Sequence, residues 1–239
     1  MSEAKESRPV GEPVDKVPAR APDERALFGR FVTLEPVSEA RHGADLWRSF
    51  ADSDPGGLLW TYMPYGPFTD EAAFRQWLGE REASLDPHFY AVVPRKKGKA
   101  SGMASLMRIT PEHGVIEIGH IWLSPRLKQT REATDALFVM MRHALDELGY
   151  RRLEWKCDAL NAPSRRAALR LGFTFEGIFR QHMVVKGRNR DTAWYSILDT
   201  EWPRLRAAFQ AWLSDDNFDS GERQRQPLAA FIEDRPHGR

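Results

Sequence analysis

The stretch that decides the fold is residues 114–149, GVIEIGHIWLSPRLKQTREATDALFVMMRHALDELG. It predicts a strand at 115–123, a polar turn at 128–131 and an amphipathic helix, because apolar side chains recur every three or four residues from Ala133 onward. Gly149 stands where a left-handed cap would end that helix. Free N–H groups of the turn and the positive end of the helix dipole make a candidate anion site. Many α/β proteins contain such a turn without binding a ligand there, so the turn alone is a weak indication.

Composition limits the class of protein. The chain has 239 residues, of which 41% are apolar and 29% charged, and its formal net charge is +1. These values suit a globular protein with a sizeable core and exclude a strong electrostatic pull toward nucleic acid or an anionic membrane. No apolar run approaches the roughly 20 residues of a membrane helix, and the N-terminus has no apolar signal region. We therefore expect a cytoplasmic protein with neither a nucleic-acid nor a membrane partner.

The single cysteine, Cys157, excludes an internal disulfide and a cysteine-rich metal site. It faces the core in the alternating stretch 151–158, so we expect no covalent acyl-enzyme. Because no spacing of His, Asp and Glu suggests a metal centre, we predict no metal cofactor.

The chain divides into three segments. Residues 1–25 are rich in proline and charge and nearly free of large apolar residues, which predicts a flexible tail. Residues 26–215 carry the periodic patterns of a single domain, and residues 216–239 read as a polar tail. One apolar patch in that tail, Leu228–Ile232, is suited to dock back onto the domain.

Within 26–215 the predicted order is a strand, two helices, three antiparallel strands, the central helix, a strand, a short helix and a hairpin. A crossover helix makes the strands on either side of it parallel. The predicted fold class is therefore α+β in three layers, with helices flanking a mixed, mostly antiparallel sheet that contains one parallel pair. Where such a sheet changes character, its strands can splay and open a slot for an extended ligand.

The loop 58–68 is aromatic and interrupted by proline and glycine. Trp60, Tyr62 and Tyr65 are our candidates for substrate binding, as the lining of a groove. An equally good interpretation is that the aromatic side chains pin a structural loop to the core, and the composition does not separate the two.

Four further segments have a recognisable combination of residues. They are EIGHIWLSP (117–125), DALNAPSRRAALRLGF (158–173), EGIFRQ (176–181) and GRNRDTAWYSI (187–197). Taken together, they make the chain resemble the GCN5-related N-acetyltransferases, and among these the group that acetylates ribosomal-protein N-termini. The resemblance runs from Leu27 to about Trp202. It implies the acyl-CoA N-acyltransferase fold, acetyl-CoA as co-substrate, and direct attack of an amine on the thioester.

The resemblance also places the cofactor. Amides at the entry of the central helix would hold the CoA pyrophosphate, and an open strand edge would pair with the pantetheine arm. Asn161 would both cap the short helix and contact a CoA amide. The expected cofactor-binding residues are Trp122, Leu123, Lys128, Gln129, Thr130, Arg131, Glu132, Ala133, Asn161 and Ser164.

Three positions depart from the family pattern. Arg131 replaces a glycine of the phosphate turn, and we expect its guanidinium to add a contact to phosphate. Ala168 stands where many relatives have a tyrosine that protonates the thiolate, and Ser164 inherits that role because it aligns with a serine that has it in the ribosomal group. Met183 replaces a glutamate that this group uses as its base.

Two residues are candidates for the missing base. Glu117 lies in an otherwise apolar strand, where burial would raise its pKa toward the range of a general base. The alternative is a solvated glutamate or one paired with Arg108. An unperturbed histidine has a pKa near neutrality, which suits His120 to act as a base. The alternative is that His120 is a half-buried histidine with a structural role in the sheet. The catalytic candidates are therefore Glu117, His120 and Ser164.

The resulting hypothesis is an acetyl-CoA-dependent N-acyltransferase that acts on a primary amine, either a protein N-terminus or a small amine, in a ternary complex. Two alternatives stay open. One is a non-catalytic acyl-CoA-binding or interaction module, which the missing tyrosine and glutamate motivate; the other is a succinyl-CoA-dependent enzyme. The sequence is compatible with a homodimer but does not indicate the oligomeric state.

Overall fold

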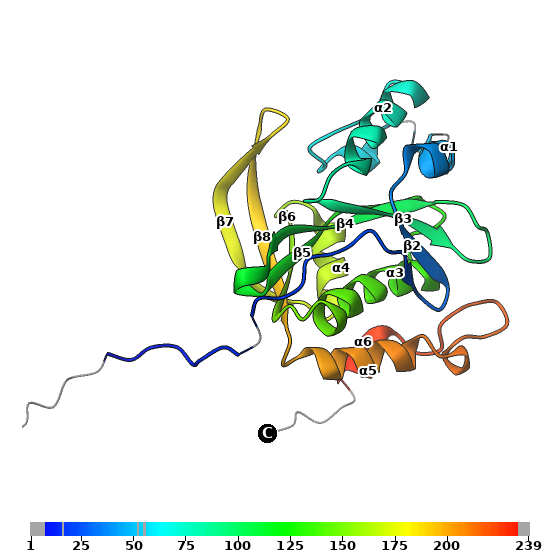
Figure 1. The fold of residues 1–239 in the computed structure, drawn as a ribbon. Coiled ribbons are helices and arrows are strands. Elements are labelled where there is room, and N and C mark those ends of the chain that lie inside the picture. Colours follow the sequence, from blue (N-terminus) through cyan, green and yellow to red (C-terminus); the bar gives the residue numbers. More distant parts are fainter. Residues whose placement is uncertain (1–7, 16, 52, 55, 234–239) are drawn as a thin grey trace, which may run out of the picture.

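A computed structural model of the chain describes residues 8–15, 17–51, 53–54 and 56–233. One eight-stranded sheet forms its centre, with strand order β1-β2-β3-β4-β5-β6-β8-β7 (Figure 1). The strands are β1 (Leu27–Phe28), β2 (Val32–Pro36), β3 (His88–Pro94), β4 (Gly102–Thr110), β5 (Val115–Leu123), β6 (Arg152–Asp158), β7 (Thr174–Val185) and β8 (Arg188–Leu198). The helices are α1 (Glu39–Phe50), α2 (Glu71–Glu82), α3 (Arg131–Arg142), α4 (Ala162–Arg170), α5 (Trp202–Trp212) and α6 (Leu228–Glu233).

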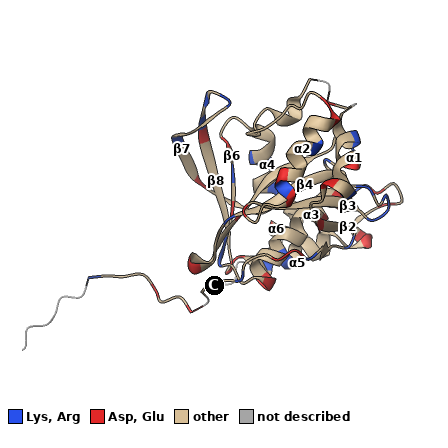
Figure 2. Ribbon diagram, turned by 45° about the horizontal axis from the view of Figure 1, so that its top comes forward, with Lys and Arg blue, Asp and Glu red and all other residues tan. Residues whose placement is uncertain are grey.

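Helices cover both faces of the sheet. In Figure 1, α1 and α2 lie on one side, and α3, α5 and α6 lie on the other. Each side has its own apolar core: one is aromatic and centred on α1, α2 and the loop between them, and the larger one is centred on α3. Acidic and basic residues are spread over the elements instead of gathering on one of them (Figure 2), as the net charge of +1 suggests. The predicted three-layer α+β fold is confirmed.

The sheet contains one parallel pair, β5 with β6, and its pairing is short. Residues Val115–Glu117 pair with Arg152–Glu154, and the two strands then separate. Beyond that point β5 is paired with β4 and β6 with β8. A register shift next to His120, which has φ of 49°, bends β5 at the same place. The predicted splay is therefore present, between the C-terminal halves of β5 and β6.

The central helix follows the sequence pattern closely. Thr130 is the N-cap of α3, and the helix continues as a π-helical turn over His143–Glu147 before Gly149, which has φ of 82°. Its apolar residues fill the larger core, in which Met140 and Met141 are fully buried. This helix fixes the position of the turn at its N-terminus relative to the end of β5.

The two terminal segments pack on the domain more than the composition indicated. Ala19 is buried and its N–H donates to Pro111 O at 3.0 Å, so the flexible tail predicted for 1–25 is wrong for its last part. At the other end Leu228 is completely buried in the larger core, as the apolar patch suggested. Residues 8–15 are exposed, and 1–7, 16 and 234–239 lie outside the described residues.

Candidate active site

The splay between β5 and β6 leaves one edge of β5 open. Trp122 and Leu123 pair with Met103 and Gly102 of β4, and within the described residues no strand pairs with their other edge. Backbone groups at such an edge can bind an extended amide chain by strand addition. The side chain of Trp122 is 2% exposed and packs in the aromatic core, so this residue can offer a ligand only its backbone.

The turn before α3 presents free amides. Gln129 has the left-handed φ of 62°, and Thr130 Oγ1 accepts the N–H of Ala133 at 3.1 Å. Across the described part of the chain, the N–H groups of Gln129, Arg131 and Glu132 have no hydrogen-bond partner. Three free amides at a helix N-terminus form an anion-binding concavity. The Ala133 amide belongs to the helix cap, which makes it a weaker candidate for phosphate than the sequence suggested.

Arg131 does not contribute its side chain to this concavity. Its guanidinium donates to Leu213 O at 2.6 Å and to Asp215 Oδ1 at 2.8 Å. It lies between the rings of Phe31 and Phe218, at 3.9 and 4.0 Å from their centroids. The expected contact of this guanidinium with phosphate is therefore wrong. The glycine of the family pattern is dispensable because Arg131 is the first residue of α3 and the left-handed conformation occurs at Gln129 instead.

The start of α4 lies beside the far wall of the splay. Asn161 Oδ1 accepts the N–H of Ser164 at 3.1 Å, which caps the helix. Ser164 Oγ accepts the indole N–H of Trp155 at 3.0 Å, so the hydroxyl retains its own proton to donate. Burial raises the pKa of the Cys157 thiol, against the opposing effect of a hydrogen bond from Ser164. A buried thiol with a raised pKa is a poor nucleophile.

Glu117 sits at the point where the strands part. Its side chain is 5% exposed and that of Lys156, on β6, is 4% exposed. Oε2 of Glu117 lies 3.1 Å from Lys156 Nζ and 3.3 Å from Arg108 Nε, so both cations pair with it. Lys156 also contacts Glu154 at 2.5 Å and lies 3.9 Å from the ring centroid of Trp194. The splay therefore contains a buried charge cluster in which two cations flank the Glu117 carboxylate.

Burial raises the pKa of Glu117 above its usual value, and the nearby cations Lys156 and Arg108 oppose that rise. The pairing with Arg108 considered from the sequence is present, so this alternative and the catalytic one are not exclusive. A carboxylate with a raised pKa is a better proton acceptor than an ordinary one.

His120 is held in the aromatic layer. Its ring stacks on Tyr65 with centroids 5.6 Å apart, and its Nδ1 lies 3.2 Å from the Tyr65 hydroxyl. Burial, followed by the charges of Arg81, Arg108 and Arg190, lowers the pKa of His120 to about 4. The imidazole is neutral at neutral pH but weakly basic, which makes it a poorer general base than Glu117.

Part of the aromatic loop is pinned to the core, as the structural interpretation expects. Trp60 is 1% exposed inside the aromatic core, so its expected contact with substrate is wrong. Tyr62 donates its hydroxyl to Leu160 O at 3.1 Å, and Lys186 of the β7–β8 hairpin donates to Trp60 O at 2.8 Å. The loop therefore reaches both the β6–α4 turn and the hairpin tip, next to the splay. Tyr65, through His120, and Trp60, through Trp122, also link the loop to β5.

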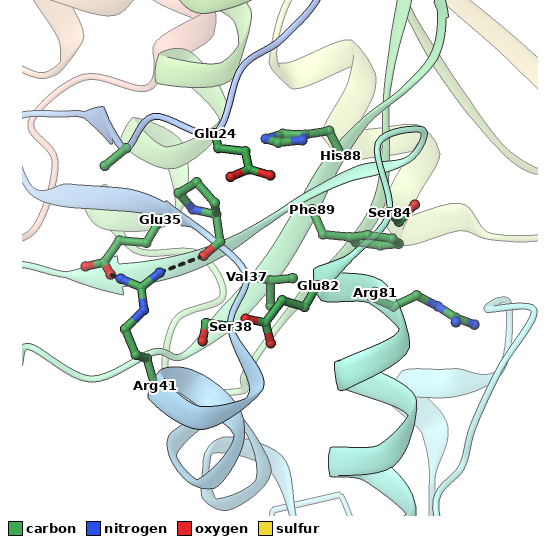
Figure 3. A pocket seen from close by; sticks show the side chains of 12 residues that line it. Glu24, Glu35, Val37, Ser38, Arg41, Arg81, Glu82, Ser84, His88 and Phe89 are labelled. Carbon is green, nitrogen blue, oxygen red and sulfur yellow. Dashed lines mark hydrogen bonds and ion pairs between the residues drawn. The ribbon is translucent and has the colours of Figure 1, made fainter.

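A cavity of about 500 Å³ lies elsewhere, between the N-terminal segment, α1, α2 and β3 (Figure 3). Its charged side chains mostly pair with protein groups: Arg41 lies 3.0 Å from Glu35, and Glu82 accepts a backbone N–H of α1. Phe89 lines this cavity and lies 5.2 Å from the His120 ring, so it stands between the cavity and the splay. We therefore look for acyl-transfer chemistry at the splay.

The pattern of acetyltransferases covers most of the domain. A family model described as "Acetyltransferase (GNAT) domain" matches residues 32–174. This chain belongs to that family. Members transfer an acetyl group from acetyl-CoA, so the chain is an acetyl-CoA-dependent N-acetyltransferase, and the free amides before α3 suit the phosphates of that co-substrate.

Solved structures agree with this assignment. A GCN5-related N-acetyltransferase from Brucella melitensis is 47% identical, with a TM-score of 0.88 over 91% of this chain and 98% of that chain. The fold alone is shared with MccE, the microcin C7 self-immunity acetyltransferase crystallised with acetyl-CoA and AMP. MccE is 20% identical, with a TM-score of 0.61 over 71% of this chain and 93% of that one.

Among curated proteins, YdaF of Bacillus subtilis is 30% identical over 105 residues, 44% of this chain. The match spans 57% of the length of YdaF, a protein named as a ribosomal N-acetyltransferase. In the described part of the chain, no helix has the length and apolar character needed to cross a membrane. No cluster of three metal-ligating side chains occurs in those residues either.

Sequence reasoning missed Lys156 and Trp194 as members of the site. In the alternating stretch 151–158, Arg152, Glu154 and Lys156 share the face opposite Cys157, and the sequence does not show that this face is covered. The cover comes from residues distant in the chain: Lys156 Nζ lies 3.9 Å from the ring centroid of Trp194 and 3.1 Å from Oε2 of Glu117. Oppositely charged residues on a covered strand indicate a buried ion cluster.

Proposed function

We propose that Glu117 is the general base of an acetyl transfer from acetyl-CoA to a primary amine. The observation that supports this proposal most directly is its buried carboxylate at the splay, which pairs with Lys156 and Arg108 and whose pKa is raised by burial. The amine nitrogen attacks the thioester carbonyl carbon, its proton passes to Glu117 directly or through a water molecule, and the C–S bond breaks.

The free amides of Gln129, Arg131 and Glu132 would hold the CoA pyrophosphate. Lys128, exposed beside them, would add a cation, and the open edge of β5 at Trp122 and Leu123 would pair with the pantetheine arm. This arrangement directs the thioester into the splay, toward Glu117 and the start of α4.

Ser164 is the proposed acid that protonates the departing thiolate. Its Oγ accepts from Trp155, and an oxygen that accepts a hydrogen bond is polarised to donate its own proton. Asn161 positions Ser164 through the helix cap and has amide hydrogens left for a contact with CoA. We propose that His120 positions Tyr65 instead of removing the proton, because its pKa is lowered to about 4.

The acceptor would enter between the aromatic loop and the β7–β8 hairpin. The contacts of Lys186 with Trp60 O and of Tyr62 with Leu160 O restrict this side, which favours a small amine or a flexible N-terminus over a side chain on a folded surface. The name of YdaF supports a ribosomal N-terminus as one candidate. The domain bounds 26–215, a cytoplasmic location and a homodimer remain predictions.

Mass spectrometry of reactions with acetyl-CoA and a panel of amines and peptide N-termini tests the proposal. We expect product with the native protein and a loss of at least 100-fold in rate with Glu117→Gln, at unchanged CoA affinity by calorimetry. CoA binding without turnover of any acceptor would instead favour the non-catalytic module. Faster transfer from succinyl-CoA than from acetyl-CoA would favour the succinyl alternative.

A further inference from the structure

One face of β8 lies along the acceptor side of the splay. Alternate residues of a strand share a face, so Arg190, Thr192 and Trp194 point the same way. Trp194 is paired in register with Lys156 and holds its ammonium group 3.9 Å from the ring centroid. Thr192 Oγ1 lies 2.9 Å from Nδ1 of His182. The three side chains form a row that begins at Trp194, beside the proposed catalytic cluster, and Arg190 lies about 7 Å beyond Thr192 along it.

This row ends in unpaired donors. The Nε of Arg190 and the indole Nε1 of Trp194 are both buried, and neither has a hydrogen-bond partner among the described residues. Arg190 makes no ion pair with any described residue, although Asp191 is adjacent to it in β8. Asp191 is already occupied, because its Oδ1 accepts from Gln181 N at 2.7 Å and from Asn189 Nδ2 at 2.9 Å.

A half-buried guanidinium without a counter-charge is unusual, because burial of an unpaired donor or charge is unfavourable. The other cations of this region are committed: Lys156 and Arg108 both contact Glu117. The positive charge of Arg190 is felt across the site, where it helps, after burial, to lower the pKa of His120 and of His182. Arg190 is therefore a cation of the acceptor side that no carboxylate of the described residues engages.

We infer that the acceptor carries an anionic group, a carboxylate or a phosphate, separated from its reacting amine by up to about 14 Å, the length of strand from Trp194 to Arg190, and that Arg190 binds this group. The inference rests on the proposed function, because it assumes that the amine approaches Glu117. A guanidinium matches both oxyanions by forming two parallel hydrogen bonds, and Trp194 adds a donor in the same row. With the amine at Glu117 and the anionic group at Arg190, the acceptor spans the row of β8 between them.

Paired acceptors separate this inference from a general amine preference. Short peptides long enough to span that row are compared with their C-terminal amides, and amidated phosphoserine peptides with their unphosphorylated forms, all with acetyl-CoA and the full chain. We expect at least one anionic member to exceed its neutral partner by 10-fold or more in kcat/KM. A carboxylate source and a phosphate source are distinguished by which pair shows the larger ratio.

Arg190→Gln should reduce that ratio to about 1, chiefly by raising KM for the anionic acceptor, while kcat/KM for the neutral partner and CoA affinity stay within 2-fold. Arg188→Gln is the matched control, because Arg188 is an exposed arginine of the same hairpin, and it should preserve the ratio. Equal rates for the members of every pair, or an equal loss for both members in Arg190→Gln, would overturn the inference.

Two further outcomes are informative. If succinyl-CoA replaces acetyl-CoA with a gain that Arg190→Gln abolishes, Arg190 binds the acyl chain and the inference is overturned. If no acceptor turns over, the proposed function fails, and calorimetry of the same amine pairs with the CoA-bound protein still decides the inference. Tighter binding of the anionic member, lost in Arg190→Gln, supports it, and equal or absent binding overturns it.

Discussion

Nζ of Lys156 lies 3.1 Å from Oε2 of Glu117, with both side chains almost completely buried where β5 and β6 separate. Each charge makes the burial of the other tolerable, since an isolated buried charge would be much more costly. The same contact favours the ionised form of Glu117, because the ammonium group opposes the rise in pKa that burial causes. Lys156 is therefore expected to set the pH range in which Glu117 can accept a proton.

Lys156→Met keeps the length of the side chain and removes its charge. Without the ammonium group the pKa of Glu117 should rise further, so the acid limb of the kcat/KM profile should move to higher pH by about 1 unit. The stability should fall by about 3 kcal/mol, because the variant leaves a buried carboxylate with one partner fewer. The pH–rate profile and urea unfolding measure the two effects. Lys97→Met, at an exposed turn, is the control, and an unmoved acid limb would contradict the proposed coupling.

A second prediction concerns His120 and the pH dependence of folding. Burial and nearby arginines lower its pKa from 6.5 to about 4 in the folded protein. Between these two values the unfolded chain binds a proton that the folded chain does not, so stability should fall as the pH decreases from 6.5 to 4. The expected loss from this residue is about 3 kcal/mol. This loss of stability is complete only below the pKa of His120 in the folded protein, and it is absent above pH 6.5.

His120→Gln should remove this part of the pH dependence. The measurement is the free energy of unfolding in urea at several pH values, taken as the difference between the native protein and the variant. Other histidines with lowered pKa, such as His42 and His143, contribute equally to both and cancel in the difference. Parallel curves for the two proteins between pH 4 and 6.5 would show that His120 titrates as in the unfolded chain.

The two basic side chains at the entry of α3 should behave differently. Arg131→Ala removes hydrogen bonds to Leu213 O and Asp215, and we expect it to lower stability by about 2 kcal/mol while CoA affinity stays within 2-fold. Lys128→Ala should leave the stability nearly unchanged and lower the CoA affinity, since Lys128 is exposed beside the free amides. It should weaken CoA binding several-fold at low salt, with a smaller effect at high salt. Calorimetry measures the CoA affinity of both variants, and thermal unfolding measures their stability. A large loss of CoA affinity in Arg131→Ala would show that the Arg131 side chain does contact phosphate.

How far the sequence predicts this structure depends on the range of the interactions. The strand, turn and helix of 114–149 follow from periodicity and capping, which are local, and the parallel pair follows from the crossover. Trp60 was assigned to a groove because aromatic composition is the same in a wall and in a core; only the packing of Trp60 against Phe50 and Trp122 decides it.

Long-range contacts account for the other differences. Arg131 looked available for phosphate because its partners at Leu213 and Asp215 are about 80 residues away in the chain. The composition of residues 1–25 predicts a flexible tail. The last part of this segment is instead held by backbone hydrogen bonds to Pro111 and Leu148, which composition cannot reveal. Lys156 was missed because alternation gives the face of a residue but not what covers that face.

The last prediction concerns the acid that completes the transfer. Ser164→Ala removes the proposed proton donor, so kcat should fall by about 100-fold, while CoA affinity by calorimetry should change little. The same variant also deprives the Trp155 indole of its acceptor at 3.0 Å, and a purely structural effect must be separated from a chemical one. Trp155→Phe removes that hydrogen bond but leaves the Ser164 hydroxyl in place. If Ser164 is the acid, Trp155→Phe should keep kcat within about 5-fold of the native protein. Equal losses in both variants would mean that Ser164 only supports the position of β6 against α4, and another group or solvent would then protonate the thiolate.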